Sequence, residues 1–124
     1  MRVIEKKIMD TIKAGKIGSY RLSCRDSVVI TENEVKVYLW SNLIFSKSGD
    51  FICFSSCGWQ SNTTKSRLNA ILSYYNLMIS QKNYTWYVES TDGLYYIVDG
   101  KRTKRWTFFD NMKINLYSYR VELK

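Results

Sequence analysis

The 124-residue chain carries 19 Lys and Arg against 11 Asp and Glu, and its net charge of +8 favours anionic partners such as nucleic acid, nucleotides or an acidic protein surface. It contains no histidine, which excludes Ser-His and Cys-His catalytic pairs and His-based metal sites. No apolar run approaches the ~20 residues of a membrane span, and three cysteines without a signal peptide predict a reducing, intracellular location.

Isoleucines recur every four residues near the N-terminus, at Ile4, Ile8 and Ile12, with charged residues between them. This spacing predicts an amphipathic helix over about residues 4–14, which Gly15 ends. We expect the helix to cover one face of a sheet and to keep its lysines in water.

Short runs of β-branched and aromatic residues begin at Tyr20, and turn residues separate them. We expect strands at 20–23, 28–31, 34–40, 42–46, 51–55, 77–81, 84–89, 94–98, 105–109 and 112–121. Asp92-Gly93 and Asp99-Gly100 are dipeptides typical of hairpin turns. The predicted fold is α+β: a single compact domain, residues 1–124, with a mostly antiparallel sheet and two helices.

The second helix is predicted over about residues 64–75, with Thr63 or Thr64 as its N-cap and Asn76 as a left-handed C-cap. Its apolar face is the clearest helical pattern in the chain and consists of Leu68, Ile71, Leu72 and Tyr75.

The first turn of this second helix carries Lys65 and Arg67 but no acid, although the partial positive charge of a helix N-terminus favours Asp or Glu. A bound anion would resolve the conflict, because free backbone N–H groups, the hydroxyls of Thr63 and Thr64 and the two cations would form a phosphate cradle. The alternative is a simple helix cap with both cations in water, where the mismatch costs only about 0.3 to 1 kcal/mol.

The densest positive patch follows the Asp99-Gly100 turn and consists of Lys101, Arg102, Lys104 and Arg105, with Trp106 beside them. Such a run can neutralise successive phosphates, and an adjacent ring adds stacking. A charge run can equally protect the edge strand of a sheet.

Aromatic residues are concentrated in the predicted strands from 84 to 109. Alternation places Tyr84 and Trp86 on one face and Tyr87 on the other. We expect most of these rings in the core, but a ring-bearing face exposed beside Arg102 or Arg105 would resemble the sheet platform of single-strand binders. Trp59 could stack on a base, although its large apolar surface favours a place in the core.

The chain offers little for catalysis. Cys53 and Cys57 lack both the two-residue spacing of thioredoxin-like sites and a second pair for a metal. The carboxylates show no pairing typical of a glycosidase or a two-metal nuclease. We therefore expect a binding protein without catalytic residues, metal or cofactor.

Three stretches resemble a widespread group of small tailed-phage proteins: FICFSSCGWQSNTTKSRLN (51–69), YTWYV (84–88) and FDNM (109–112). The resemblance covers roughly residues 27–112 and centres on a Gly-Trp-x-x-x-Thr-Thr-Lys-x-Arg-Leu-Asn motif. The chain departs from the group's usual pattern at Cys57 and Asn111, where the group has glycine, and its segment 90–105 looks longer. The resemblance implies a phage-encoded protein in the cytoplasm of the infected bacterial host cell; it implies no particular activity.

The leading hypothesis is a module that binds nucleic acid or a phosphorylated nucleotide through Lys65, Arg67 and the helix N-terminus together with the hairpin at residues 101–105. This combined site requires both segments to lie on one face of the protein. One alternative is an inhibitor that binds a host or anti-phage defence protein through an acidic surface of that partner. Another is a structural or cargo protein of the virion.

Overall fold

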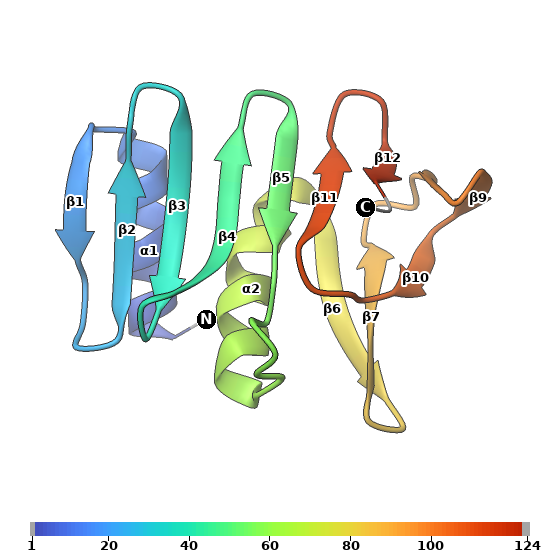
Figure 1. Ribbon diagram of the computed structural model, residues 1–124, viewed down its shortest axis with the longest axis horizontal. Coiled ribbons are helices and arrows are strands. Elements are labelled where there is room, and N and C mark those ends of the chain that lie inside the picture. Colours follow the sequence, from blue (N-terminus) through green and yellow to red (C-terminus); the bar gives the residue numbers. More distant parts are fainter. Residues whose placement is uncertain (1, 123–124) are drawn as a thin grey trace.

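The computed structural model describes residues 2–122 and arranges them in two layers (Figure 1). The elements before the centre of the chain are α1 (Val3–Ala14), β1 (Gly18–Arg21), β2 (Asp26–Ile30), β3 (Glu34–Leu39), β4 (Asn42–Ser48) and β5 (Phe51–Phe54). They are followed by α2 (Asn62–Leu72), a 3-10 turn (Ser73–Tyr75), β6 (Leu77–Lys82), β7 (Thr85–Ser90), β8 (Tyr96–Val98), β9 (Lys101–Thr103), β10 (Arg105–Thr107), β11 (Met112–Asn115) and β12 (Arg120–Glu122).

Two sheets account for the strands. Nine strands form a large sheet in the order β1-β2-β3-β4-β5-β11-β12-β8-β9, in which only the β12–β8 pair is parallel. The second sheet, β10-β7-β6, is antiparallel. The predicted α+β fold, with a mostly antiparallel sheet and two helices, is confirmed.

Both helices follow the predicted local signals closely. Helix α1 ends at Gly15, whose φ of 66° is the left-handed conformation that glycine adopts readily. Helix α2 begins two residues earlier than predicted, because Ser61 is the N-cap in place of Thr63 or Thr64. The 3-10 turn carries the helical path to Tyr75, and Asn76 closes it with φ 59°, as predicted.

One hydrophobic cluster fills the space between the layers. The helices and the small sheet lie behind the large sheet in Figure 1, with α1 behind β2 and β3. A row of paired residues crosses the inner face of the large sheet: Val28, Val37, Phe45, Phe54 and Met112. The neighbouring row on the outer face is mostly polar: Val29, Lys36, Ser46, Cys53 and Lys113. That outer face is turned toward the viewer, and no element of residues 2–122 is drawn over it (Figure 1).

The two predicted hairpin dipeptides have different outcomes. Asp99 and Gly100 both adopt positive φ, 51° and 75°, and join β8 to β9 in a tight turn, as predicted. The hairpin predicted at Asp92-Gly93 is wrong, because this loop carries the chain from β7 in the small sheet to β8 in the large one. The chain returns at Lys104, which alone separates β9 from β10.

Two predicted strands also differ from the structure. Tyr84 belongs to the turn between β6 and β7, with φ 65° and 93% of its surface exposed, so it does not share a face with Trp86. The predicted strand 112–121 is a hairpin in which Asn115 pairs with Arg120.

Candidate functional site

The predicted site residues fall into two groups that the fold keeps apart. Residues 63–67 lie in the first turns of α2, at the bottom of Figure 1, whereas residues 101–105 lie at its upper right. Strand β9 ends the large sheet, while α2 packs against β4 and β6. The combined site predicted from both segments is therefore wrong.

The start of α2 uses its polar groups internally. Ser61 Oγ accepts a hydrogen bond from the Thr64 backbone N–H at 3.1 Å and lies 3.0 Å from Thr64 Oγ1. The Thr64 side chain is buried, Thr63 is half-buried, and Lys65 Nζ donates to Gln81 Oε1 at 2.9 Å. The start of α2 therefore has a simple helix cap, which was the alternative to a phosphate cradle. The hydroxyl of Thr64 is not free for a phosphate.

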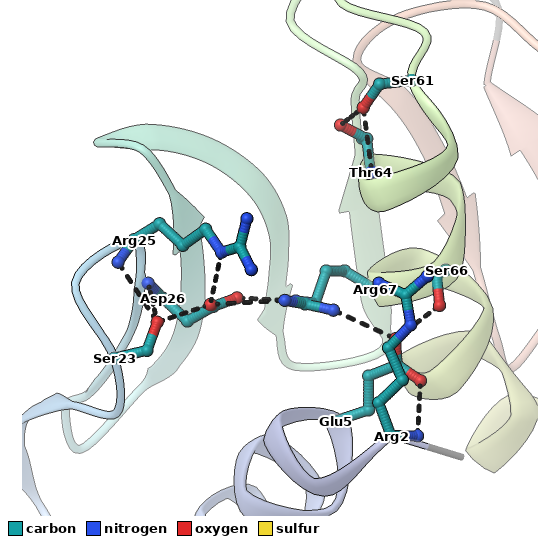
Figure 2. A network of polar contacts seen from close by, with 9 residues as sticks. All are labelled: Arg2, Glu5, Ser23, Arg25, Asp26, Ser61, Thr64, Ser66 and Arg67. Carbon is teal, nitrogen blue, oxygen red and sulfur yellow. Dashed lines mark hydrogen bonds and ion pairs between the residues drawn. The ribbon is translucent and has the colours of Figure 1, made fainter.

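Arg67 lies inside the protein and holds two carboxylates from distant parts of the chain. Its Nε donates to Asp26 Oδ1 at 2.7 Å, and its Nη1 donates to Glu5 Oε2 at 3.1 Å. The Arg67 side chain is only 1% exposed. Figure 2 shows how the guanidinium lies between Glu5 of α1 and Asp26 of β2. The prediction that Arg67 binds a phosphate is wrong, because both ends of its guanidinium are already paired.

Additional hydrogen bonds complete this buried network. Ser23 Oγ donates to Asp26 Oδ2 at 2.7 Å, and Ser66 Oγ donates to Glu5 Oε2. Arg25 Nε lies 3.9 Å from Asp26 Oδ2 at the edge of the network (Figure 2). A buried ion pair is tolerated when further hydrogen bonds satisfy its remaining atoms, so the Arg67 cation near the start of α2 has a structural reason.

Trp59 corrects a second expectation, because it lies on the surface and not in the core. Its side chain is 72% exposed. The surrounding loop is held by its backbone, with Trp59 N–H donating to Ser56 O and Ser61 N–H donating to Trp59 O, both at 2.9 Å. Trp59 is thus free to stack on a ligand, and it lies in the loop between β5 and α2.

The basic hairpin, defined here as Lys101, Arg102, Lys104 and Arg105, lies on the surface with all four side chains exposed. Three of its cations lie over tyrosine rings. Arg102 Cζ and Lys104 Nζ are each 4.8 Å from the centre of the Tyr95 ring, and Arg105 Cζ is 4.0 Å from the centre of the Tyr87 ring. Within residues 2–122, none of the four cations lies within salt-bridge distance of a carboxylate.

Trp106 is the one predicted member of this patch that does not reach the surface. It is only 7% exposed, and its Nε1 donates to Met112 Sδ at 3.2 Å. Its ring centre lies 5.2 Å from that of Tyr96 in the core. The prediction that Trp106 contacts nucleic acid is wrong, because alternation along β10 turns Trp106 inward and Arg105 outward.

The two rings that accompany the cations, Tyr87 and Tyr95, were not among the predicted site residues, although a ring-bearing face beside Arg102 or Arg105 was considered. The signal for Tyr87 was available, since strand alternation places it on the face opposite the buried Trp86. Tyr95 carried no such signal, because it precedes β8 and its position beside Arg102 depends on the β8–β9 pairing.

The other candidate chemistries find little support in residues 2–122. No group of three His, Cys, Asp or Glu side chains there could hold a metal ion. Burial raises the pKa of the Cys53 thiol, and the nearby Lys113 ammonium offsets this only in part, so Cys53 stays a thiol. No helix in the same range is long and apolar enough to cross a membrane.

Comparison with known proteins identifies a family. Residues 1–115 match the model described as Kyanoviridae Gp96 protein. The chain belongs to the Kyanoviridae Gp96 protein family. This membership supports the expectation of a small phage protein family, and the match extends over a longer range than the residues 27–112 on which the resemblance was based. No curated protein and no solved structure shows a significant match to the chain.

The range matched to the Kyanoviridae Gp96 family includes the basic hairpin and the central motif. Two polar side chains of the resembling stretches 51–69 and 109–112 hold backbone segments together. Asn69 pairs with the backbone of Ile79, donating to its carbonyl at 3.0 Å and accepting from its N–H at 2.6 Å. Asp110 accepts from the backbone N–H groups of Ser56 at 2.8 Å and Gly58 at 3.0 Å, and from the Ser56 hydroxyl at 2.6 Å. Arg67, Asn69 and Asp110 are therefore architecture, whereas the four cations of the basic hairpin are exposed.

Proposed function

We propose that the protein is a non-catalytic module that binds nucleic acid through the basic hairpin in the cytoplasm of the infected bacterial cell. The observation that carries this proposal is the packing of Arg102, Lys104 and Arg105 over the rings of Tyr95 and Tyr87, at 4.0 to 4.8 Å. The cations supply the attraction to phosphates that dominates nucleic-acid affinity.

The rings contribute in two ways. A guanidinium or ammonium group over an aromatic face is held in place while its N–H groups remain free for phosphate oxygens. Less side-chain freedom is then lost on binding. Tyr95 is 47% exposed, so part of its ring is also available to a base. A purely acidic protein partner would use the charges but not the ring surfaces, which favours nucleic acid over that alternative.

The test is fluorescence anisotropy of a labelled oligonucleotide at increasing salt. The hairpin variant replaces Lys101, Arg102, Lys104 and Arg105 with Ala, and the matched control replaces four exposed lysines of the N-terminal region with Ala: Lys6, Lys7, Lys13 and Lys16. Both variants lose the same charge. We expect the hairpin variant to bind more weakly, and its salt slope to fall by about 0.7 for each phosphate that the variant no longer neutralises.

The control should retain most of its affinity and slope. Equal losses in both variants would mean that only net charge matters, and the hairpin would then not be the site. Absence of binding even at low salt would refute nucleic-acid binding altogether.

A further inference from the structure

The outer face of the large sheet is hollowed next to the basic hairpin. The hollow has a volume of about 440 Å³ and lies between the β8–β9 hairpin and the turn that joins β11 to β12. Its main lining residues are Leu94, Tyr95, Ile97, Arg102, Ser118 and Tyr119. This volume is within the range of about 300 to 1,000 Å³ typical of small-molecule sites.

The walls of the hollow are apolar and aromatic, and they are held in place. Leu94, Tyr95 and Tyr119 are 45%, 47% and 38% exposed, so each ring and the leucine present surface to a ligand. Tyr119 is fixed twice: its carbonyl accepts from Ile97 N–H at 2.7 Å, and its ring meets the buried Tyr96 ring edge-on at 5.3 Å. None of the lining residues is acidic.

Basic side chains lie on one side of the hollow only. Arg102 belongs to its lining, and Lys104 reaches the same Tyr95 ring from the next outward position of the chain. A second hollow of about 290 Å³ adjoins it beyond Ile97, but that one is lined by Asp99 and Glu122 as well as an arginine. Carboxylates repel phosphates, so a nucleic-acid backbone is favoured on the Arg102 and Lys104 side.

We infer that this hollow takes an unpaired nucleobase, which makes the ligand of the basic hairpin single-stranded nucleic acid. The inference rests on the proposed function. The flat faces of bases stack on aromatic side chains only when the bases are unpaired and unstacked, whereas phosphate contacts alone do not distinguish single strands from duplexes. An aromatic hollow with cations at one rim supplies both kinds of contact to a single strand.

The experiment compares three ligands of one length by anisotropy at one salt concentration. Oligothymidylate and oligouridylate present bases as DNA and RNA, and an abasic DNA strand presents the same phosphates without bases. We expect the abasic strand to bind more weakly than either base-bearing strand.

Tyr119→Gly removes one wall of the hollow and suits the backbone there, because Tyr119 has a φ of 56° that glycine adopts freely. We expect it to weaken oligothymidylate binding about fivefold to 150-fold, the loss typical of one base stack, with no change for the abasic strand. Tyr117→Ala is the matched control, since that ring is 83% exposed on the same turn and does not line the hollow.

Leu94→Asp is a second variant in case Tyr119→Gly does not fold; it places a carboxylate in the hollow and should weaken binding of both base-bearing strands. The hollow would not be a nucleobase site if the protein bound abasic and base-bearing strands with equal affinity. The same would follow if a folded Tyr119→Gly or Leu94→Asp variant bound oligothymidylate as tightly as the native chain. Either result would leave the hairpin proposal intact. Failure of all three ligands to bind would refute the proposed function itself.

Discussion

The guanidinium of Arg67 donates to Asp26 at 2.7 Å in a region where both side chains are only 1% exposed. The same guanidinium reaches Glu5 at 3.1 Å. One buried cation thereby joins α2 to β2 and to α1. Its removal would leave Glu5 without this counter-charge and Asp26 with only the more distant Arg25, at 3.9 Å.

Arg67→Met is expected to lower the free energy of unfolding by about 3 to 5 kcal/mol, because breaking a buried ion pair leaves an uncompensated charge. Urea denaturation followed by circular dichroism measures this loss. Lys65→Met is the matched control in the same helix, and its effect should stay within about 0.5 kcal/mol because Lys65 bonds only to the exposed Gln81. Equal stability of the two variants would show that the network contributes nothing.

Asn69→Ala is expected to loosen the free edge of the small sheet. Strand β6 ends that sheet, and the Asn69 amide satisfies both backbone groups of Ile79 there. Losing these two bonds should cost about 1 to 3 kcal/mol and speed hydrogen exchange at the Ile79 amide. Asn62→Ala, at the exposed start of the same helix, should leave that exchange rate unchanged. An unchanged rate of hydrogen exchange at the Ile79 amide in Asn69→Ala would contradict the proposal that Asn69 stabilises this edge strand.

Asp110 should make stability fall in acid. Burial raises the pKa of Asp110, but hydrogen bonds from the Ser56 hydroxyl and from the Ser56 and Gly58 amides outweigh it and bring the pKa below its ordinary value. A carboxyl with a lowered pKa in the folded state contributes stability above its unfolded pKa of about 3.9 and loses it as pH falls through the lower folded value.

Thermal denaturation between neutral pH and about pH 3 tests this contribution. Asp110→Asn should be less stable than the native chain at neutral pH and should lose less stability on acidification. Asp10→Asn, on the exposed face of α1, should show the native pH dependence. If Asp110→Asn and the native chain lost the same amount of stability on acidification, the Asp110 carboxylate would not be a source of the acid sensitivity.

Trp59→Ala should leave both stability and nucleic-acid affinity nearly unchanged. Its ring is 72% exposed, so its removal should alter the unfolding free energy by no more than about 0.5 kcal/mol. Trp59 lies in the loop between β5 and α2, and that loop is well separated from β9 (Figure 1). Anisotropy with oligothymidylate checks the second point; a clear loss of affinity would show that the ligand extends to the start of α2.

Local sequence patterns predicted the structure correctly wherever the contacts that determine it lie within a few residues along the chain. The isoleucine period of α1, the left-handed Asn76 and the Asp99-Gly100 turn were all predictable, since each depends on backbone conformation or on neighbours one turn away. The outward position of Tyr87 was also readable, because alternation ties it to its inward neighbour Trp86.

By itself, then, the sequence determined the α+β class, both helices, the phage family resemblance and the basic segment at residues 101–105. The tertiary structure alone decided which cations are free. Arg67 looked free in its own helix because its partners, Glu5 and Asp26, lie 62 and 41 residues away in sequence. Arg102 and Lys104 gained a ring because strand pairing brings Tyr95 to them. Long-range packing is set by the whole fold, so it leaves no pattern in the few residues around a side chain.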